Sequence, residues 1–353
     1  MLVRLLLVLS LTARVAAAQT PTIVEADFVI SDFRFDSGEV LPQLRLHYRT
    51  VGTPQRDAAG KVANAVIVMH GTGGSGAQFI GENFAGELFG PGQPLDAARH
   101  FVVLPDAIGH GKSSKPSDGL RATFPRYGYG DMVRAHYRLM TEGLGAGRLR
   151  LVMGTSMGGM HTWVWGERYP ESMDALMPLA SLPDQISGRN RAWRRVAIDA
   201  IRTDPSWQGG DYTSQPQGLR TVAQMLWLAG SNPIIRQAAA PTLADADRVL
   251  DTYVDAYVKT GDANDILYAI EASRDYDPEP GLEKIVAPLV AINSADDIIN
   301  PPELRILERA IPRVKRGSAI VLPLSDETVG HGTHTRAVLW KAHLAALLKA
   351  TER

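Results

Sequence analysis

The 353-residue chain contains no cysteine. Disulfides, a thiol nucleophile, thiolate metal sites and a lipidated cysteine anchor are therefore excluded, and any nucleophile must be an oxygen. The chain also has little net charge, −1 at neutral pH, which gives no reason to expect nucleic acid or a charged surface as a partner. A small neutral substrate is the simpler expectation. No motif indicates a cofactor or a metal, and nothing in the sequence indicates an oligomeric state.

The N-terminus has only a short apolar run, too short to span a bilayer. It lies at residues 5–11, after a basic start at Arg4 and before the small-residue stretch Ala16–Ala18. This pattern is typical of a secretory signal peptide at residues 1–18, cleaved to leave Gln19 as the first residue. We therefore expect a secreted or periplasmic protein without stable membrane insertion. The alternative is a true N-terminal helix or an uncleaved anchor.

The rest of the chain is 45% hydrophobic overall and long enough to bury a large core. Residues 28–50 alternate in polarity, as a hairpin does, with a turn at Ser37-Gly38. Continuous apolar runs, typical of parallel strands buried on both faces, follow at residues 65–69, 101–105, 149–153, 176–180, 288–292 and 319–324. Segments long enough for crossover helices separate them, which predicts an α/β fold with a mostly parallel sheet flanked by helices.

This alternation of apolar strands with helix-length segments stops between about Pro183 and Leu282. The segment instead has helical stretches of mixed polarity, which carry three tryptophans, Trp193, Trp207 and Trp227. We interpret residues 183–282 as a mostly helical cap inserted into a core formed by residues 19–182 and 283–353. Packing of the cap on the core is the expected role of each tryptophan, although aromatic residues there could also line a pocket.

One serine has the setting of a nucleophile. Gly154-Thr155-Ser156-Met157-Gly158 follows an apolar strand and precedes an apolar helical segment that ends near Tyr169-Pro170. A residue projecting from a sharp strand-to-helix turn presses its neighbours at minus two and plus two together, so only very small side chains fit there. The alternative is an accidental Gly-Ser-Gly turn.

A serine nucleophile needs a base, and the base needs an orienting acid. In this architecture they follow in the order serine, acid, histidine, on loops after strand ends. Asp297 is favoured over Asp296, because it stands four residues before Pro301, which opens the next helix. His331, preceded by glycine beyond the last strand, is favoured over His334. A structural hydrogen bond is the alternative role for either histidine.

Two backbone N–H groups are expected to form an oxyanion hole. One belongs to Met157, at the start of the helix after the nucleophile. The other is assigned to Thr72 in the glycine-rich loop at residues 70–75. A phosphate-binding loop is the alternative, but the segment lacks the Lys-Ser/Thr ending of a P-loop.

With these residues the chain resembles the α/β-hydrolase superfamily, and within it the homoserine O-acetyltransferase-like family. The resemblance covers nearly all of the chain after the signal peptide. Its most specific motifs are Leu104–Gly111, Phe124-Pro125 with Asp131–Val133, Gly154–Met160, and Asp204-Pro205 with Gly209–Tyr212. It implies a triad of Ser156, Asp297 and His331, with an acyl group passing through Ser156.

The sequence departs from this family where the substrate is recognised. In the cap, Ala223 and Gly230 stand where the transferases have an arginine and a tyrosine, and Gly332 replaces an aspartate after the catalytic histidine. A pocket without these partners would desolvate the charges of an amino acid at a cost of several kcal/mol. We therefore predict hydrolysis of a small acyl ester, with acetyl transfer from acetyl-CoA to homoserine as the alternative. A non-catalytic binding protein of the same fold is a third possibility, which the complete set of triad loops disfavours.

Overall fold

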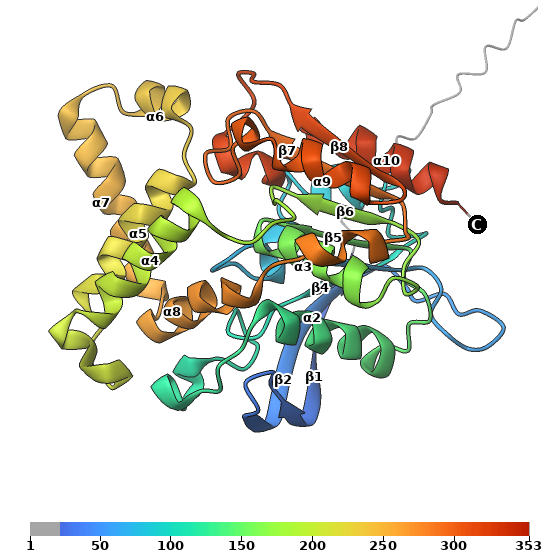
Figure 1. The fold of residues 1–353 in the computed structure, drawn as a ribbon, viewed down its shortest axis with the longest axis horizontal. Helices are drawn as coiled ribbons and strands as arrows, with labels where there is room; N and C mark the ends of the chain where they lie inside the picture. Colours follow the sequence, from blue (N-terminus) through green and yellow to red (C-terminus); the bar gives the residue numbers. More distant parts are fainter. Residues whose placement is uncertain (1–21, 353) are drawn as a thin grey trace, which may run out of the picture.

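A computed structural model describes residues 22–352 of the chain, and its architecture is that of an α/β fold (Figure 1). A single sheet has eight strands in the order β1-β2-β4-β3-β5-β6-β7-β8. The strands are β1 (Ile23–Arg34), β2 (Val40–Val51), β3 (Ala65–Met69), β4 (Phe101–Pro105), β5 (Leu151–Thr155), β6 (Leu176–Leu179), β7 (Leu289–Ser294) and β8 (Gly317–Leu322). The signal peptide predicted at residues 1–18 lies outside the described residues.

The first two strands form the predicted hairpin and make the only antiparallel edge of the described sheet. β1 pairs with β2, so that Ile30 lies opposite Leu44, and β2 then pairs antiparallel with β4. Gly38 closes the turn with a φ of 88°, a conformation that glycine adopts without strain. Leu44 and Leu46 point to the core, as the alternating pattern requires.

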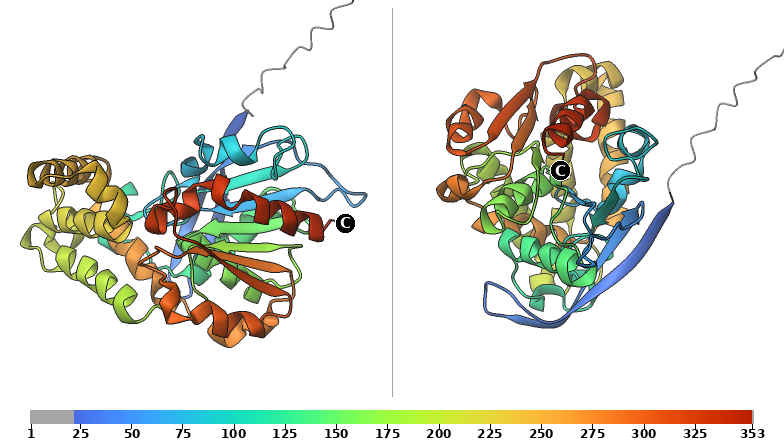
Figure 2. Two further views of the ribbon diagram at one scale, coloured as in Figure 1. Left: turned by 90° about the horizontal axis from the view of Figure 1, so that it is seen from above. Right: turned by 90° about the vertical axis from the view of Figure 1, so that its right-hand side faces the viewer.

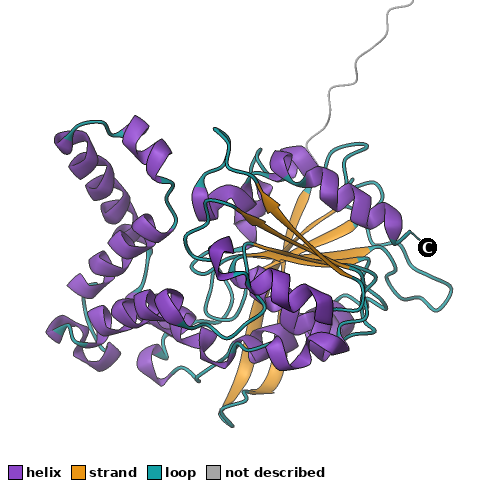
Figure 3. Cartoon of the chain, turned by 45° about the horizontal axis from the view of Figure 1, so that its top comes forward, coloured by secondary structure: helices purple, strands orange, loops and turns teal. Residues whose placement is uncertain are grey.

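From β4 to β8 all strand pairs are parallel, and both faces of the sheet are covered (Figure 3). Within β3, Ile67 belongs to one core and its neighbour Val68 to the core on the opposite face. Burial on both faces explains why the sequences of these strands are continuously apolar.

The ten α-helices of the described chain are α1 (Ala85–Leu88), α2 (Tyr129–Arg138), α3 (Met157–Arg168), α4 (Gly188–Arg202), α5 (Gln217–Ala229), α6 (Pro233–Ala239), α7 (Leu243–Thr260), α8 (Ala263–Glu271), α9 (Ile306–Ala310) and α10 (Lys341–Ala350).

Some predicted strand limits were wrong by one or two residues. The strand predicted at 149–153 is β5 at Leu151–Thr155, because Leu149 makes only an isolated bridge to Met173 while Gly154 and Thr155 pair with neighbouring strands. The strand predicted at 319–324 is β8 at Gly317–Leu322, which pairs with β7 from its first residue.

Between β6 and β7 the chain forms helices and no strand, and α4 to α7 lie beside the sheet at one end of the molecule (Figures 1 and 2). Helices α4, α5 and α8 share a hydrophobic core of their own, which includes Ile198, Leu219 and Ile270. Tyr268 on α8 packs into the main core instead, so α8 joins the two parts. Residue limits of 183 and 282 for a separate cap domain remain a prediction.

Candidate active site

Ser156 occupies a strained turn between β5 and α3. Its φ of 54° and ψ of −114° are rare for a residue with a side chain. Its N–H donates to the Leu179 carbonyl at 2.9 Å, which ties the turn to the neighbouring strand β6. The side chain is half-buried and therefore reachable from solvent.

The glycines around Ser156 are required by close backbone contacts. A Cβ atom on Gly154 would lie 2.3 Å from the carbonyl oxygen of Gly158, so the residues at minus two and plus two do press together. A Cβ on Gly158 would lie 2.0 Å from the Met69 carbonyl oxygen, and one on Gly159 2.4 Å from that of Leu179. The turn therefore cannot form with alanine at these positions unless the sheet moves.

His331 and Asp297 reach Ser156 from the loops that follow β8 and β7. His331 Nε2 lies 2.8 Å from Ser156 Oγ, and His331 Nδ1 lies 2.8 Å from Asp297 Oδ2. Parallel strands end on one edge of the sheet, which brings residues 156, 297 and 331 together despite their separation in sequence. The three residues predicted from the sequence thus form one continuous hydrogen-bonded chain.

The carboxylate of Asp297 is held in its ionised form. It is only 2% exposed, and its Oδ1 accepts from the N–H groups of Ile299 and Asn300 at 2.8 and 3.1 Å. The Asn300 side chain donates to Oδ2 at 3.1 Å. Burial raises the pKa of Asp297, but His331 and these donors outweigh it and lower the pKa to about 2.

Asp296 and His334, the alternatives to Asp297 and His331, make no hydrogen bond to Ser156 and have other surroundings. Asp296 accepts from the Gly330 N–H at 2.7 Å and from Asn232 Nδ2 at 2.6 Å, so it holds the histidine loop and links it to the cap. His334 is half-buried, its buried Nδ1 has no hydrogen-bond partner, and its ring centre lies 5.2 Å from that of His331. Burial lowers the pKa of His334 to about 3, so it stays neutral.

The two residues assigned to the oxyanion hole flank the nucleophile. Met157 is the first residue of α3, where backbone N–H groups have no partner within the helix and the helix dipole favours negative charge. The loop that carries Thr72 passes against the serine, because a Cβ on Gly71 would lie 3.3 Å from Ser156 Cβ. Their role in stabilising an oxyanion remains a prediction.

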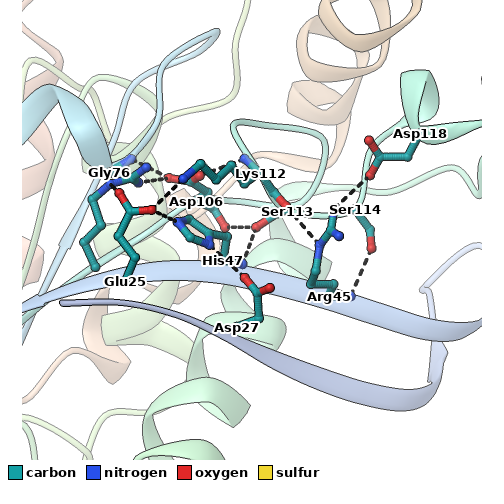
Figure 4. A network of polar contacts seen from close by, with 11 residues as sticks. Glu25, Asp27, Arg45, His47, Gly76, Asp106, Lys112, Ser113, Ser114 and Asp118 are labelled. Atoms are coloured by element: carbon teal, nitrogen blue, oxygen red, sulfur yellow. Dashed lines mark hydrogen bonds and ion pairs between the residues drawn. The ribbon is translucent and has the colours of Figure 1, made fainter.

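A buried carboxylate that the sequence analysis did not single out as functional anchors this loop (Figure 4). Asp106 follows β4, is fully buried, and accepts from the N–H groups of Gly76 and Lys112 at 2.7 and 2.9 Å. Arg49 on β2 donates to it at 3.0 Å and also pairs with Glu25. The carboxylate lies directly after an apolar strand, and that position is the signal that could have indicated its importance.

Several further features bear on the substrate. A cavity of ≈ 410 Å³ separates the segment Gly73–Ser75 from α7 and α8, but its lining includes neither Ser156 nor His331. Ala223 is buried on α5, and Gly230 ends that helix. A Cβ on Gly332 would meet only Val329 Cγ2, at 3.4 Å, so a larger residue has room there.

Residues 22–352 contain neither a metal-binding cluster nor a helix able to cross a membrane. No group of three or more His, Asp or Glu in residues 22–352 is arranged to hold a metal ion. Over the same residues, no helix combines the length and the apolar character that crossing a membrane requires.

Comparisons with known proteins agree with this geometry. The family model of the alpha/beta hydrolase fold matches residues 64–320. A homoserine O-acetyltransferase of Pelobacter propionicus is 32% identical over 316 residues, which are 79% of this chain and 83% of that protein.

Two solved structures share the fold. The crystal structure of homoserine O-acetyltransferase from Bacillus anthracis has a TM-score of 0.80 at 21% identity, covering 92% of this chain and 97% of that one. The acetyl esterase MekB has a TM-score of 0.79 at 24% identity, with 92% and 97% covered. The chain is thus an enzyme that belongs to the α/β-hydrolase superfamily and, within it, to the homoserine O-acetyltransferase-like family.

Proposed function

We propose that the protein is a serine hydrolase that cleaves a small acyl ester through an acyl-enzyme at Ser156. The observation that carries the proposal is the pair of 2.8 Å contacts that connects Ser156 Oγ through His331 to Asp297. A serine hydroxyl is a weak nucleophile until a positioned base takes its proton.

In the first half-reaction, His331 Nε2 takes the Ser156 proton while Oγ attacks the ester carbonyl. The N–H groups of Met157 and Thr72 bind the oxyanion that forms, and Asp297 stabilises the imidazolium. The C–O bond of the ester then breaks, and His331 returns the proton to the departing alcohol. In the second half-reaction, His331 deprotonates a water that attacks the acyl carbonyl. The bond between the acyl carbon and Ser156 Oγ then breaks and His331 returns the proton to Oγ, so the products are a carboxylic acid and the regenerated serine.

Acyl transfer to an alcohol is the second candidate, and the Pelobacter relative, named a homoserine O-acetyltransferase, favours it. The same acyl-enzyme serves both reactions, so the distinction depends on what binds as the acceptor. Gly332 and Ala223 offer no charge to the ammonium and carboxylate of homoserine, and this favours water. Export of the protein, which we also propose from residues 1–18, would separate it from acetyl-CoA.

A two-part experiment tests the proposal. A fluorophosphonate probe should label the parent and not Ser156→Ala, and Ser156→Ala should lower kcat for ester hydrolysis by roughly 10⁴ to 10⁶. Equal labelling of both proteins would contradict a nucleophilic Ser156.

The second part measures the acceptor. A panel of p-nitrophenyl esters and acetyl-CoA is assayed with and without millimolar homoserine. Hydrolysis should be unaffected, and no O-acetylhomoserine should accumulate. Efficient formation of O-acetylhomoserine from acetyl-CoA would establish the transferase instead.

A further inference from the structure

One arginine of the cap is buried without a negative partner. Arg194 on α4 is 3% exposed. Its Nε donates to Asn190 Oδ1 at 3.0 Å and its NH1 to Ser273 Oγ at 3.1 Å, and both acceptors are neutral. Among residues 22–352, no carboxylate oxygen lies within 4.0 Å of its guanidinium.

Two other arginines on the same helix do have a carboxylate partner. Arg195 pairs with Asp199 at 2.7 Å, and Arg202 pairs with Glu271 at 2.6 Å, although both arginines are more exposed than Arg194. A buried cation without an anion is destabilising, so the folded chain gains stability if an anion binds there. Arg189 and Arg191 of the same helix also form no ion pair with a described residue, but neither is buried. Arg194 is thus the only buried arginine of α4, and it has no counter-ion among the described residues.

A second buried polar group points to the same place. The hydroxyl of Tyr129, at the start of α2, is buried and has no hydrogen-bond partner. Burial raises the pKa of Tyr129, while the Arg194 guanidinium and the Thr72 hydroxyl beside it lower it. Tyr129 is therefore close to both Arg194 and Thr72, and Thr72 belongs to the loop that borders Ser156.

We propose that Arg194 and Tyr129 form a carboxylate subsite beside the acyl-enzyme, so that the preferred substrates are esters carrying a negatively charged carboxylate. The carboxylate accepts charge-assisted hydrogen bonds from the guanidinium and one from the phenolic hydroxyl. This inference rests on the proposed function, because Ser156 determines where the rest of the ester lies. The cap thus offers a carboxylate a cation from α4, although Ala223 on α5 offers none, and the ammonium of homoserine still has no partner at Gly332.

The carboxylate can belong to the acyl part or to the alcohol part, and matched substrates distinguish the two. p-Nitrophenyl hemiglutarate is compared with p-nitrophenyl valerate, and 3-acetoxypropionate with its methyl ester. In at least one of these two comparisons, the charged ester should have a higher kcat/KM than its neutral partner. Arg194→Met should lower kcat/KM for that charged ester by roughly 10- to 100-fold. The neutral partner should change less than threefold. Tyr129→Phe should act in the same direction more weakly, and Arg194→Lys should restore part of the preference.

Arg195→Met is the matched control, because this arginine lies next in sequence, faces solvent and already has a carboxylate partner. It should leave the ratio of charged to neutral kcat/KM unchanged. A readout without turnover complements the assay: glutarate should raise the Tm of the parent, glutaramide should not, and Arg194→Met should abolish the glutarate effect.

The outcomes separate the two proposals. Suppose that the fluorophosphonate probe labels Ser156, but Arg194→Met lowers kcat/KM for charged and neutral esters equally and glutarate does not change the Tm. Arg194 then has a structural role, and the proposed carboxylate subsite is wrong. If glutarate protects the parent in an Arg194-dependent way while no ester is hydrolysed and no label is taken up, the subsite stands and the hydrolase proposal fails.

Discussion

Replacing Asp297 by asparagine changes one atom of the candidate triad and should nearly abolish activity. All four groups around this carboxylate are donors: the N–H groups of Ile299 and Asn300, the Asn300 amide and the His331 ring. An asparagine NH₂ must face one of these donors. The imidazole then loses its oriented Nδ1–H tautomer and the charge that stabilises the imidazolium.

The expected loss is roughly 10⁴ in kcat, equivalent to about 5 kcal/mol of transition-state stabilisation. Stability should fall as well. Lowering the pKa of Asp297 from 3.8 to about 2 means that the native state stabilises the ionised form by about 2 kcal/mol. A depressed carboxyl pKa contributes stability above the unfolded value of 3.8, and that contribution is lost as the pH falls through about 2. The parent should therefore have the higher Tm at pH 7, and the difference should shrink towards pH 2.

Asp296→Asn is the matched control, because it makes the same change one residue earlier. Its carboxylate contacts Gly330 N and Asn232 Nδ2 but not His331, so kcat should stay within about tenfold, with about 1 kcal/mol lost in stability. Ester hydrolysis at substrate saturation and thermal unfolding from pH 2 to 8 measure both effects. A near-parental kcat for Asp297→Asn, or a larger loss for Asp296→Asn, would refute the assignment of the acid.

Other predictions follow from the same contacts. His331→Gln should lower kcat by roughly 10⁴ or more, because it removes the base in contact with Ser156. His334→Gln leaves that contact in place, so the folded fraction of this variant should retain its activity. Steady-state kinetics measures kcat, and circular dichroism measures the folded fraction. Gly158→Ala places a Cβ against the Met69 carbonyl and should destabilise the protein by roughly 3 kcal/mol. Gly332→Ala has room for its Cβ and should leave stability unchanged. The Tm values of the two variants test this difference. Intact mass of protein secreted by a native-like host should begin at Gln19, and a soluble cytoplasmic product that retains Met1 would contradict export.

The sequence predicted the strands of the sheet because two-sided burial leaves a clear local pattern. Residues 65–69 and 101–105 are apolar throughout, and both runs are strands with those limits. The ends of a strand depend on which residues of the neighbouring strands pair with it, and the local apolar pattern does not indicate this pairing. The strand predicted at residues 149–153 therefore differs by two residues from β5 at Leu151–Thr155. The triad was predictable for a related reason: each member has a local marker, glycines around Ser156, Pro301 after Asp297, and Gly330 before His331.

Arg194 and Tyr129 have no such marker. Arg194 is one of five arginines on α4, and nothing in the sequence distinguishes this buried residue from the other four, which are all more exposed. Its missing counter-ion becomes visible only when α4 packs against Ser273 and Tyr129, which lie far away in sequence. Asp106 differs in part: its position directly after β4 is a local marker, but its partner Arg49 comes from β2 and becomes evident only in the fold.

The last prediction concerns the ion pair between Arg49 and Asp106. Arg49→Met leaves a fully buried carboxylate with only two backbone donors, Gly76 and Lys112, and should cost roughly 3–5 kcal/mol of stability. Arg45→Met on the same strand is the control, because its ion pair with Asp118 is exposed and should be worth less than about 1 kcal/mol.

The effect of Arg49→Met should extend to catalysis, because Gly76 directly follows the loop that supplies Thr72. With Asp106 less firmly held, the folded variant should show a lower kcat, while fluorophosphonate should still label Ser156, whose contact with His331 is independent of Arg49. The double variant Arg49→Met/Asp106→Asn removes both charges, so it should recover part of the stability lost in Arg49→Met alone. A double-mutant cycle measured by urea unfolding gives this coupling. A coupling near zero would mean that Asp106 is held by its backbone donors alone and that Arg49 does not position the loop.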